Sequence, residues 1–324
     1  MDRPMDTSRV ARLGTLRQLE IFVAVAEHGS MARAAEALHL SHSAVSVQVG
    51  KLADAVGLPL HEVIGKRLFL TDAGREVAEA GRVVFEALSR LDQRVDALRG
   101  LAAGRLRISV VTTAKYFLPR ILGPFCREYP GIDVSFHVGN RAQIIERLED
   151  NRDDLYFFND LPEDLDIRAH PFLPNPLAVI ASSRHPLAGR SGLRWEDLAE
   201  EKFLMREEGS GTFNAIRRHL ERQGQRLGKT MTIESNEAIK YAVVENMGIT
   251  ILSAYVLADA VGHDLVQLRV QGFPILSDWY VVYPGSRTLS PAGERFLEFI
   301  LRKGPDVLPM EKLEAQVERA LQRV

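Results

Sequence analysis

The stretch that most constrains the fold of this chain is residues 29–57, GSMARAAEALHLSHSAVSVQVGKLADAVG. It predicts two short helices joined by a tight turn, because Ser30 and Ser41 can each accept hydrogen bonds from the free amides of a following helix. The small side chains of Ala34 and Ala35 allow another helix to pack closely. The second helix carries apolar residues at 4-3-4 spacing, which defines a buried face of Val45, Val49, Leu52 and Val56.

The opposite face of this second helix carries small polar residues near its N-terminal end, Ser43 and Ser46, with His42 beside them. Short polar side chains suit a helix that approaches the edges of DNA bases. A solvated amphipathic helix would show the same pattern when taken alone. The capped helix and the tight turn before it favour a helix-turn-helix, whose last helix lies in the major groove.

The segments on either side extend this motif. Residues 16–28 carry an apolar stripe at helical spacing and are followed by a glycine, which predicts a first helix. Residues 60–64 and 68–70 predict two short strands, and the tip between them holds two cations, Lys66 and Arg67. Such a wing can meet phosphate or the minor groove. A plain surface hairpin is the alternative interpretation.

Composition sets broad limits. A length of 324 residues predicts about two domains, or three with one small, and the hydrophobic and charged fractions of 46% and 26% are those of a globular protein. No apolar run approaches the roughly 20 residues of a membrane span, and the first residues resemble no signal peptide, so we expect a cytoplasmic protein without membrane contact. The single cysteine, Cys126, excludes an intrachain disulfide, and its apolar surroundings predict burial. The net charge of −2 neither supports nor excludes nucleic-acid binding.

A long helix is predicted over residues 71–104, with Thr71 as its cap. About 30 residues at a rise of 1.5 Å give roughly 45 Å, too long for a small monomeric domain. Apolar residues alternate at spacings of 4 and 3, which indicates a seam that needs a partner helix. We expect a linker helix that forms a dimer through Val77, Val84, Leu88, Leu91, Val95 and Leu98, with Gly81 in the seam. A helix packed against its own domain is the alternative.

Strands and helices alternate through residues 105–303, which predicts an α/β unit with a largely parallel sheet. We expect two lobes around a cleft: lobe I from residues 105–182 with 284–303, and lobe II from residues 183–283. Residues 304–324 predict a helical extension, whose role the sequence does not reveal.

Ligands of such folds lie at the carboxyl ends of strands and at helix N-termini. Hydroxyls, amides, glycine-rich backbone and cations gather at these positions and suit an anion, such as a phosphorylated metabolite. Ordinary helix caps are the alternative interpretation. The expected binding residues are Thr112, Thr113, Lys115, Asn140, Arg141, Asn159, Arg206, Ser210, Thr212, Ser235, Asn236 and Lys240.

Nothing in the sequence predicts an enzyme. It contains no nucleophile–base constellation, no metal-ligand cluster and no nucleotide loop, and GSG at residues 209–211 is too short for a phosphate-binding fingerprint. We therefore expect no catalytic residue, no metal and no cofactor. A solute-binding protein is a further alternative, but it would carry a signal peptide and lack the helix-turn-helix.

Residues 16–75 resemble the winged helix-turn-helix of LysR-type transcriptional regulators. The resemblance rests on Gly29-Ser30, Ala34-Ala35, Ala44-Val45-Ser46 and Leu70-Thr71-Asp72-Ala73-Gly74. It implies a DNA-binding domain over residues 1–70, with base contacts from His42, Ser43 and Ser46 and phosphate contacts from Arg33, Lys66 and Arg67. The family usually has Gln-Pro in place of His42-Ser43, which bears on the operator sequence more than on the fold.

The similarity continues to residue 303 and narrows to the CbbR-like branch, which regulates Calvin-cycle carbon-fixation operons. It rests on VVTTAKYFLPR, VGNRAQ, REEGSGT, ESNEAIKYAV and GFPILSDWYVVYP. It implies an effector domain like a periplasmic binding protein and a phosphorylated metabolite as effector. It also implies that the protein activates transcription, forms a homotetramer on double-stranded promoter DNA and contacts RNA polymerase. The alternative is a LysR-type regulator of another operon with a different anionic effector.

One departure from this branch lies in the expected cleft. The branch tends to have Met-Gly after the third strand of this domain, where this chain has Phe158-Asn159-Asp160. A carboxylate at this place would repel an anion or bind its hydroxyl groups, so we expect Asp160 to alter the choice of effector.

Overall fold

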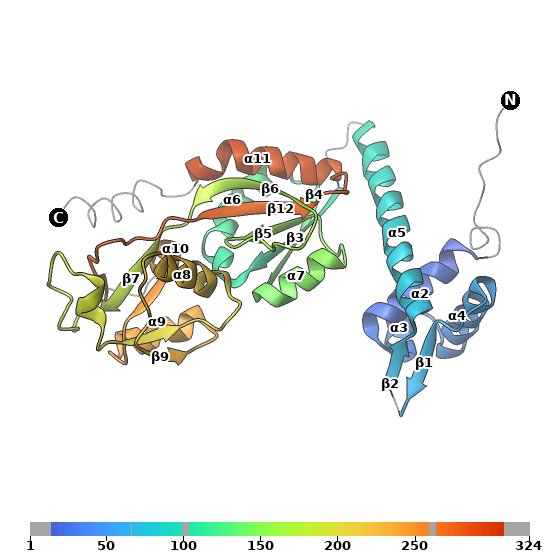
Figure 1. The fold of residues 1–324 in the computed structure, drawn as a ribbon. Coiled ribbons are helices and arrows are strands. Elements are labelled where there is room, and N and C mark those ends of the chain that lie inside the picture. The colour runs from blue at the N-terminus through green and yellow to red at the C-terminus, as the bar shows by residue number, and fades with distance from the viewer. Residues whose placement is uncertain (1–13, 66, 99–103, 259–263, 308–324) are drawn as a thin grey trace. The chain divides into compact units, whose positions relative to one another are not determined.

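The computed structural model describes residues 14–65, 67–98, 104–258 and 264–307, and it divides into two compact units, residues 1–92 and 93–324. Figure 1 labels their helices and strands. Lys66, at the tip of the expected wing, and residues 308–324 of the expected extension lie outside the described residues. Among the helices that are described, none combines the length and the apolar character needed to cross a membrane.

The N-terminal unit is a winged helix-turn-helix. Both predicted serine caps are confirmed, because Ser30 Oγ accepts from the amide of Arg33 at 3.5 Å and Ser41 Oγ accepts from that of Ala44 at 3.1 Å. Gly29 ends the first helix in the left-handed region, at φ 59°. The elements are α2 (Leu16–His28), α3 (Met31–Ala37), α4 (His42–Val56), β1 (His61–Ile64), β2 (Arg67–Leu70) and the start of α5 (Asp72–Leu98).

The core of this unit lies where α2, α3 and α4 meet. The predicted buried face of α4 is confirmed at Val45, Val49 and Leu52, whereas Val56 is only partly buried. Ala34 is fully buried and lets α3 pack closely. The same helix therefore keeps its opposite face free of contacts with this core.

The first turns of α5 also belong to this core. Ala78 is fully buried, and Val77 packs against the same apolar cluster. A Cβ on Gly81 would meet the side chain of Val23 in α2 at 2.6 Å. Val77 is thus covered by its own domain instead of lying in an exposed seam. The missing side chain of Gly81 likewise allows α5 to pack closely against α2 of the same domain. Heptad spacing shows that a helix needs a neighbour but does not say which neighbour covers each turn.

The second unit contains a five-stranded sheet in the order β4-β3-β5-β12-β6. Strands β3, β4 and β5 are parallel, but β12 is antiparallel to both of its neighbours. The sheet is therefore mixed rather than largely parallel. Its strands are β3 (Gly104–Val111), β4 (Ile132–Gly139), β5 (Leu155–Phe158), β6 (Ile167–Pro174) and β12 (Asp278–Pro284).

The other lobe is built from two smaller sheets. One has the antiparallel order β10-β7-β11, and the other pairs β8 with β9 in parallel. A single bridge between Phe203 and Ile249 links the two sheets. The strands are β7 (Leu177–Ser182), β8 (Lys202–Met205), β9 (Lys229–Thr232), β10 (Thr250–Ser253) and β11 (Leu265–Gln267).

The chain crosses between the lobes earlier than expected at both places. Strand β7 lies in the sheet of lobe II and β12 in that of lobe I, so lobe I comprises residues 104–175 and 277–307, and lobe II the described residues between them. The two crossings lie side by side, because the amide of Asn175 donates to Ser277 O at 2.7 Å. Ser253 Oγ adds a bond of 2.7 Å to Asn175 Oδ1. Apolar runs predict strands, but they do not reveal which sheet a strand joins.

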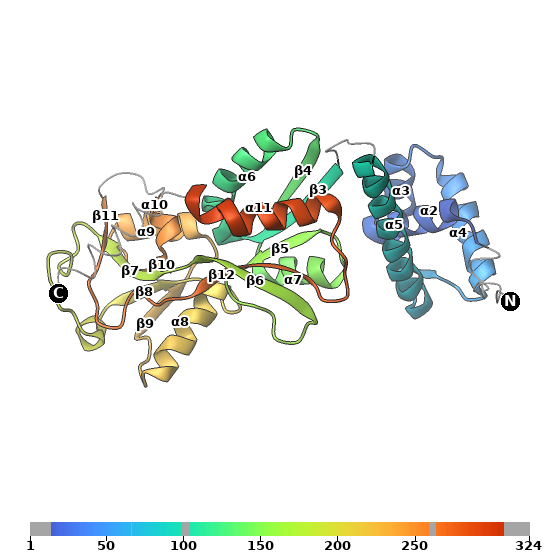
Figure 2. The ribbon, with the colours of Figure 1, turned by 90° about the horizontal axis from the view of Figure 1, so that it is seen from above.

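Helices cover both faces of the five-stranded sheet. Helices α6 (Leu118–Glu128) and α11 (Pro291–Val307) pack side by side, and α7 (Arg141–Glu149) lies on the opposite face (Figures 1 and 2). Cys126 is exposed on α6, so the predicted burial is wrong. The inward stripe of this helix consists of Ile121, Leu122 and Phe125, and the next residue points outward. The remaining elements are η1 (Thr112–Tyr116), η2 (Trp195–Leu198), α8 (Gly211–Arg222), α9 (Asn236–Val244) and α10 (Ala254–Ala258).

Candidate functional site

The outward face of α4 is open to solvent. His42, Ser43 and Ser46, which the resemblance assigns to base contacts, are all exposed. Ser43 Oγ lies 3.1 Å from Ser41 Oγ, so the two hydroxyls share a hydrogen bond at the start of the helix. Arg33 is exposed on α3. The predicted base-contact residues therefore lie together at the N-terminal end of one accessible helix.

The predicted wing is present as an antiparallel hairpin in which Ile64 pairs with Arg67. Gly65 turns the chain at φ 66°, a left-handed conformation that favours glycine. Arg67 is exposed at the tip. Directly after the hairpin, Thr71 Oγ1 accepts from the amide of Gly74 at 3.0 Å, which confirms the predicted cap of α5.

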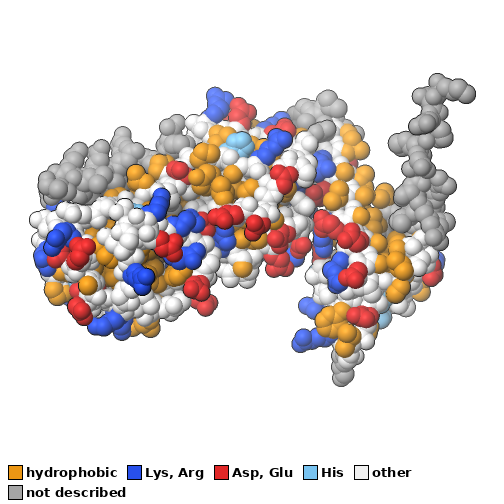
Figure 3. All heavy atoms as spheres, viewed as in Figure 1, with side chains coloured by type: hydrophobic (Ala, Val, Ile, Leu, Met, Phe, Trp, Pro, Cys, Tyr) orange, Lys and Arg blue, Asp and Glu red, His pale blue; other side chains and the backbone are white. Residues whose placement is uncertain are grey.

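Beyond its first turns, α5 carries apolar side chains that are exposed among the described residues. Val84, Leu88 and Leu91 are exposed by 37%, 38% and 56%, and Val83 adds to the same stretch of helix. Figure 3 shows hydrophobic side chains along α5. Val95 is partly buried, and the side chain of Leu98 lies outside the described part of the chain. The exposed apolar residues of the expected seam therefore begin after Gly81, and the dimer itself stays a prediction.

Four of the predicted binding residues meet across the two lobes. Arg206 Nη1 donates to Asn236 Oδ1 at 2.9 Å, and Arg206 Nη2 lies 3.5 Å from Thr112 Oγ1 of lobe I. Asn236 Nδ2 donates to Thr113 Oγ1 at 3.1 Å. Arg206, Asn236 and Thr113 are buried. The carboxyl end of β3 and the N-terminus of α9 thus share one polar network, as their positions in the sequence predict.

Arg206 is already engaged within the protein. Its Nε and Nη2 donate to the two carboxylate oxygens of Glu207 at 2.8 and 2.7 Å. A forked pair of this kind is strong and directional. An anion that reaches Arg206 must therefore displace Glu207 or bind beside it. The sequence analysis predicted that Arg206 binds the effector, but not that the carboxylate of Glu207 accepts hydrogen bonds from its guanidinium group.

A second ionic cluster links the lobes through Glu237, at the start of α9. Lys115 Nζ lies 2.7 Å from Glu237 Oε1, and Tyr116 OH donates to the same oxygen at 2.6 Å. Partial burial opposes ionisation, but the hydrogen bonds from Lys115 and Tyr116 prevail and lower the pKa of Glu237 to about 2. Burial and the bond to Glu237 raise the pKa of Tyr116, which therefore remains a donor. Lys240 Nζ lies 5.1 Å from the centre of the Tyr116 ring.

Asp160 does not present a free charge to the cleft. Its carboxylate lies 2.5 Å from Arg218 Nη2 and 3.4 Å from Arg141 Nε, and it accepts from Asn214 Nδ2 at 2.7 Å. Arg141 also donates to the carbonyl oxygens of Asp160 and Leu161. This buried aspartate therefore ties α8 of lobe II to lobe I. The repulsion expected from the sequence is offset by cations that lie far from Asp160 along the chain.

The lobes also come close together at Gly211, the first residue of α8. A Cβ there would lie 2.9 Å from Asn159 Cγ and 3.0 Å from Asp160 Cβ. Asn159 and Thr212 are both buried at this contact. Asn159 Nδ2 is buried without a hydrogen-bond partner in the described residues. A donor of this kind is costly to bury, which makes it a candidate partner for a ligand.

The remaining predicted residues act as helix caps. Asn140 Oδ1 accepts from the amide of Gln143 at 2.9 Å, and Ser210 Oγ accepts from that of Phe213 at 3.2 Å. Ser235 caps α9 in the same way and is exposed. For these three side chains, the alternative interpretation as ordinary caps agrees with the structure.

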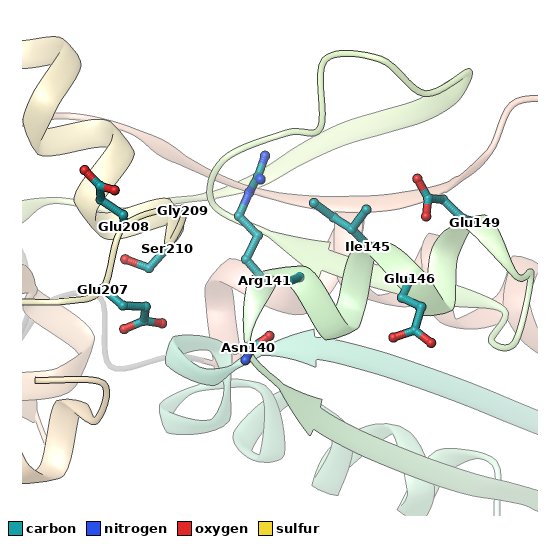
Figure 4. A pocket seen from close by; sticks show the side chains of 10 residues that line it. Asn140, Arg141, Ile145, Glu146, Glu149, Glu207, Glu208, Gly209 and Ser210 are labelled. Atoms are coloured by element: carbon teal, nitrogen blue, oxygen red, sulfur yellow. The ribbon is translucent and has the colours of Figure 1, made fainter. Parts of the chain in front are cut away.

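A pocket of about 360 Å³ opens between the start of α7 and the loop before α8. Figure 4 shows Asn140 and Arg141 on one side and residues 207–210 on the other. Its rim is acidic, with Glu146, Glu149, Glu207 and Glu208. A neighbouring pocket of about 340 Å³ shares Arg141 and lies over Asp160 and Arg218. Among the described residues, no group of His, Cys, Asp or Glu side chains could hold a metal ion.

Sequence reasoning missed the partners of the predicted cations. Glu207 directly follows Arg206 in the chain, so a search for acids beside the predicted cations would have found it. Glu237 gives no such signal, because it lies far along the chain from its partner Lys115. Asn214 and Arg218 lie one turn apart on the outward face of α8 and give no such signal. Their role depends on which loop of lobe I faces that helix.

Two family models cover most of this chain. The model "Bacterial regulatory helix-turn-helix protein, lysR family" matches residues 16–75, and "LysR substrate binding domain" matches residues 99–305. Together with the winged helix-turn-helix and the two-lobed second unit, these matches define the class: the chain belongs to the LysR family of transcriptional regulators.

The relatives agree with the branch expected from the sequence. The HTH-type transcriptional activator CmpR of Synechocystis is 44% identical over 88% of this chain and 94% of its own length. A RuBisCO operon transcriptional regulator of Acidithiobacillus ferrooxidans is 42% identical over 91% of this chain and 96% of its own. The Synechocystis CcmR regulatory domain in complex with 2-PG is 43% identical, with a TM-score of 0.58 over 61% of this chain and 95% of that one.

Proposed function

We propose that this protein is a sequence-specific transcriptional regulator that activates a carbon-fixation operon in response to a small phosphorylated metabolite. The observation that carries the proposal is the presence, in one chain, of an exposed recognition helix and a two-lobed domain whose lobes meet through polar side chains. A regulator needs both parts, whereas a solute-binding protein or an enzyme that uses the cleft has no need of the first.

DNA recognition is assigned to the exposed end of α4. His42, Ser43 and Ser46 supply hydrogen-bonding groups to base edges, and Arg33 and Arg67 contact phosphates. Lys66 is assigned to the same phosphate contacts from the sequence. Because this surface carries few cations, affinity depends on joining two or more copies, and the uncovered face of α5 provides the means.

The effector is assigned to the cleft between the lobes. A phosphate group competes with Glu237 for Lys115 and Tyr116, and with Glu207 for Arg206, because each carboxylate occupies donors that an anion can use. The relative that binds 2-PG supports a ligand of this size and charge. The hydroxyls of Thr112 and Thr113 and the free amide of Asn159 offer further donors.

The proposed mechanism couples this exchange to DNA. Replacing carboxylates by a ligand changes the bonds that hold lobe II on lobe I, and the paired crossings at Asn175 and Ser277 serve as the hinge. The altered lobe angle changes how dimers assemble into a tetramer. The spacing of the recognition helices changes with it, and so does the bend of promoter DNA that RNA polymerase meets.

The test is a footprint of the full chain on DNA upstream of its own gene, with and without 2-PG and ribulose bisphosphate. We expect a protected region whose pattern changes with one phosphorylated metabolite. Lys115→Ala should protect the same region without that change, whereas Lys229→Ala, on an exposed strand of the same lobed unit, should behave as the unaltered protein. Absence of any protection would disprove the proposal.

A LysR-type regulator with a different small anionic effector is the second candidate. The acidic rim of the pocket between α7 and the loop before α8 favours it, because carboxylates disfavour a highly charged anionic ligand. A footprint that changes with a monocarboxylate, but with none of the phosphorylated metabolites, would support this second candidate.

A further inference from the structure

Val47 stands out on the outward face of α4. Its side chain is 54% exposed, and no other large apolar residue of this helix is exposed to a comparable degree. Its neighbours on the accessible surface are Ser43, one turn before it, Ser46 beside it, and Gly50, one turn after it. All three are exposed and short, and a Cβ on Gly50 would meet nothing within 4 Å. The two methyl groups of Val47 are therefore the protruding apolar feature of this face.

The fold does not use this side chain. The core contacts of α4 come from Val45, Val49 and Leu52, which lie on the opposite face. A β-branched residue is also a poorer helix former than alanine. An exposed valine at the centre of the face thus stabilises neither the helix nor the core of the described unit, and its methyl groups remain available for a partner.

The chemistry of the major groove supplies one apolar partner. Among the four base pairs, only those with thymine present a methyl group there, at C5. The short side chains around Val47 let the helix backbone come close to the bases, so that a side chain of only three carbons can reach them. The hydroxyls of Ser43 and Ser46 lie on either side for hydrogen bonds to adjacent base edges.

We infer that Val47 reads the C5 methyl group of a thymine in each half of the operator. The inference rests on the proposed function, because it requires α4 to lie in the major groove. It adds a specificity-determining residue that is apolar, whereas the assigned base contacts of His42, Ser43 and Ser46 are polar. Recognition at this position depends on a methyl group rather than on a hydrogen bond.

The test removes the methyl group from the DNA instead of the protein. Deoxyuridine replaces thymidine, one symmetrical pair of positions at a time, in the operator fragment that footprinting defines. One methyl group withdrawn from water is worth about a fourfold change in affinity, so two half-sites together give about fifteenfold. We expect the full-length protein to lose about this much at one pair of positions.

Three variants connect the effect to Val47. Val47→Ala should bind the thymidine operator more weakly and should no longer distinguish uridine at that pair. Val47→Thr keeps the shape but loses one methyl group, and should distinguish the two bases less well. Val138→Ala, the same substitution at an exposed valine of β4 in the second unit, should keep the full discrimination.

The outcomes separate this inference from the function on which it rests. Equal affinity for all uridine operators, or undiminished discrimination by Val47→Ala, would overturn the role of Val47 and leave DNA binding intact. Failure to bind any promoter fragment would overturn both the inference and the proposed function.

Discussion

Replacing Gly211 with alanine should force the two lobes of the second unit apart. The new Cβ would lie 2.9 Å from Asn159 Cγ and 3.0 Å from Asp160 Cβ, and real Cβ atoms do not come closer than this to other heavy atoms. Neither neighbour has room to move, because both are buried and Asp160 is held by Arg218 and Asn214. The strain must therefore be relieved by a shift of α8 against lobe I.

The expected cost follows from these distances. Forcing extra atoms into a filled site lowers the free energy of unfolding by about 1–3 kcal/mol. Alanine is a better helix former than glycine, which raises it by at most about 0.5–1 kcal/mol. We expect a net loss of about 1–2 kcal/mol in the free energy of unfolding. Because the contact joins the lobes, the proposed effector should also bind with a changed affinity.

Urea unfolding followed by tryptophan fluorescence measures this loss. The chain has two tryptophans, and Trp195 and Trp279 lie in lobe II and lobe I, so the signal reports on the second unit alone. Gly189→Ala is the matched control, because a Cβ there meets nothing within 4 Å and its backbone is unstrained. Asn159→Ala should rescue Gly211→Ala by removing the side chain that clashes.

Two results would refute this reasoning. If Gly211→Ala unfolds at the same urea concentration as Gly189→Ala, the lobes yield without cost. If Asn159→Ala brings no rescue, the strain lies elsewhere than at the contact between Gly211 and Asn159.

Three further predictions concern the other sites. The pKa of Glu237 is lowered from its ordinary value of about 4.5 to about 2, so its ionised form stabilises the fold above pH 4.5, and this stability is lost as the pH falls toward 2. In Glu237→Gln, the urea concentration at the unfolding midpoint should therefore fall less steeply between pH 4.5 and pH 2 than in the unaltered protein. Leu91→Asp should yield monomers in sedimentation velocity, whereas Val77→Ala should only destabilise the N-terminal unit, and a dimeric Leu91→Asp would contradict the shortened seam. Arg67→Ala should weaken binding about equally for all DNA sequences and lower the slope of log K against log salt by about 1, as titrations at several salt concentrations would show. A loss confined to the operator would instead assign Arg67 to base contacts.

The N-terminal unit was largely determined by its sequence. Ser30 and Ser41 cap helices, and Gly29 and Gly65 turn the chain, through bonds and torsions that involve only residues a few positions away. The buried face of α4 follows from spacing alone. Such features can be predicted because their physical causes lie within a few residues of one another, and the exposed His42, Ser43 and Ser46 follow from them.

The cleft was predicted only in outline. Strand ends and helix N-termini located Thr113, Arg206 and Asn236, which do meet. Whether Lys115 meets the acid that neutralises it depends on how one lobe faces the other. Lys115 and Glu237 are far apart in the chain and only 2.7 Å apart in space, and nothing local specifies that pairing.

Tertiary structure alone decided where each apolar element finds its cover. Strands β7 and β12 both have the sequence of a buried apolar run. The sequence placed β7 in lobe I and β12 mainly in lobe II, whereas the structure pairs β7 in lobe II and β12 in lobe I. Val77 and Leu91 occupy equivalent heptad positions, but the core of the N-terminal unit covers the first, and the second is exposed. Hydrophobic burial is not directional, so a pattern in the chain fixes which residues must be covered, and only the packed structure determines what covers them.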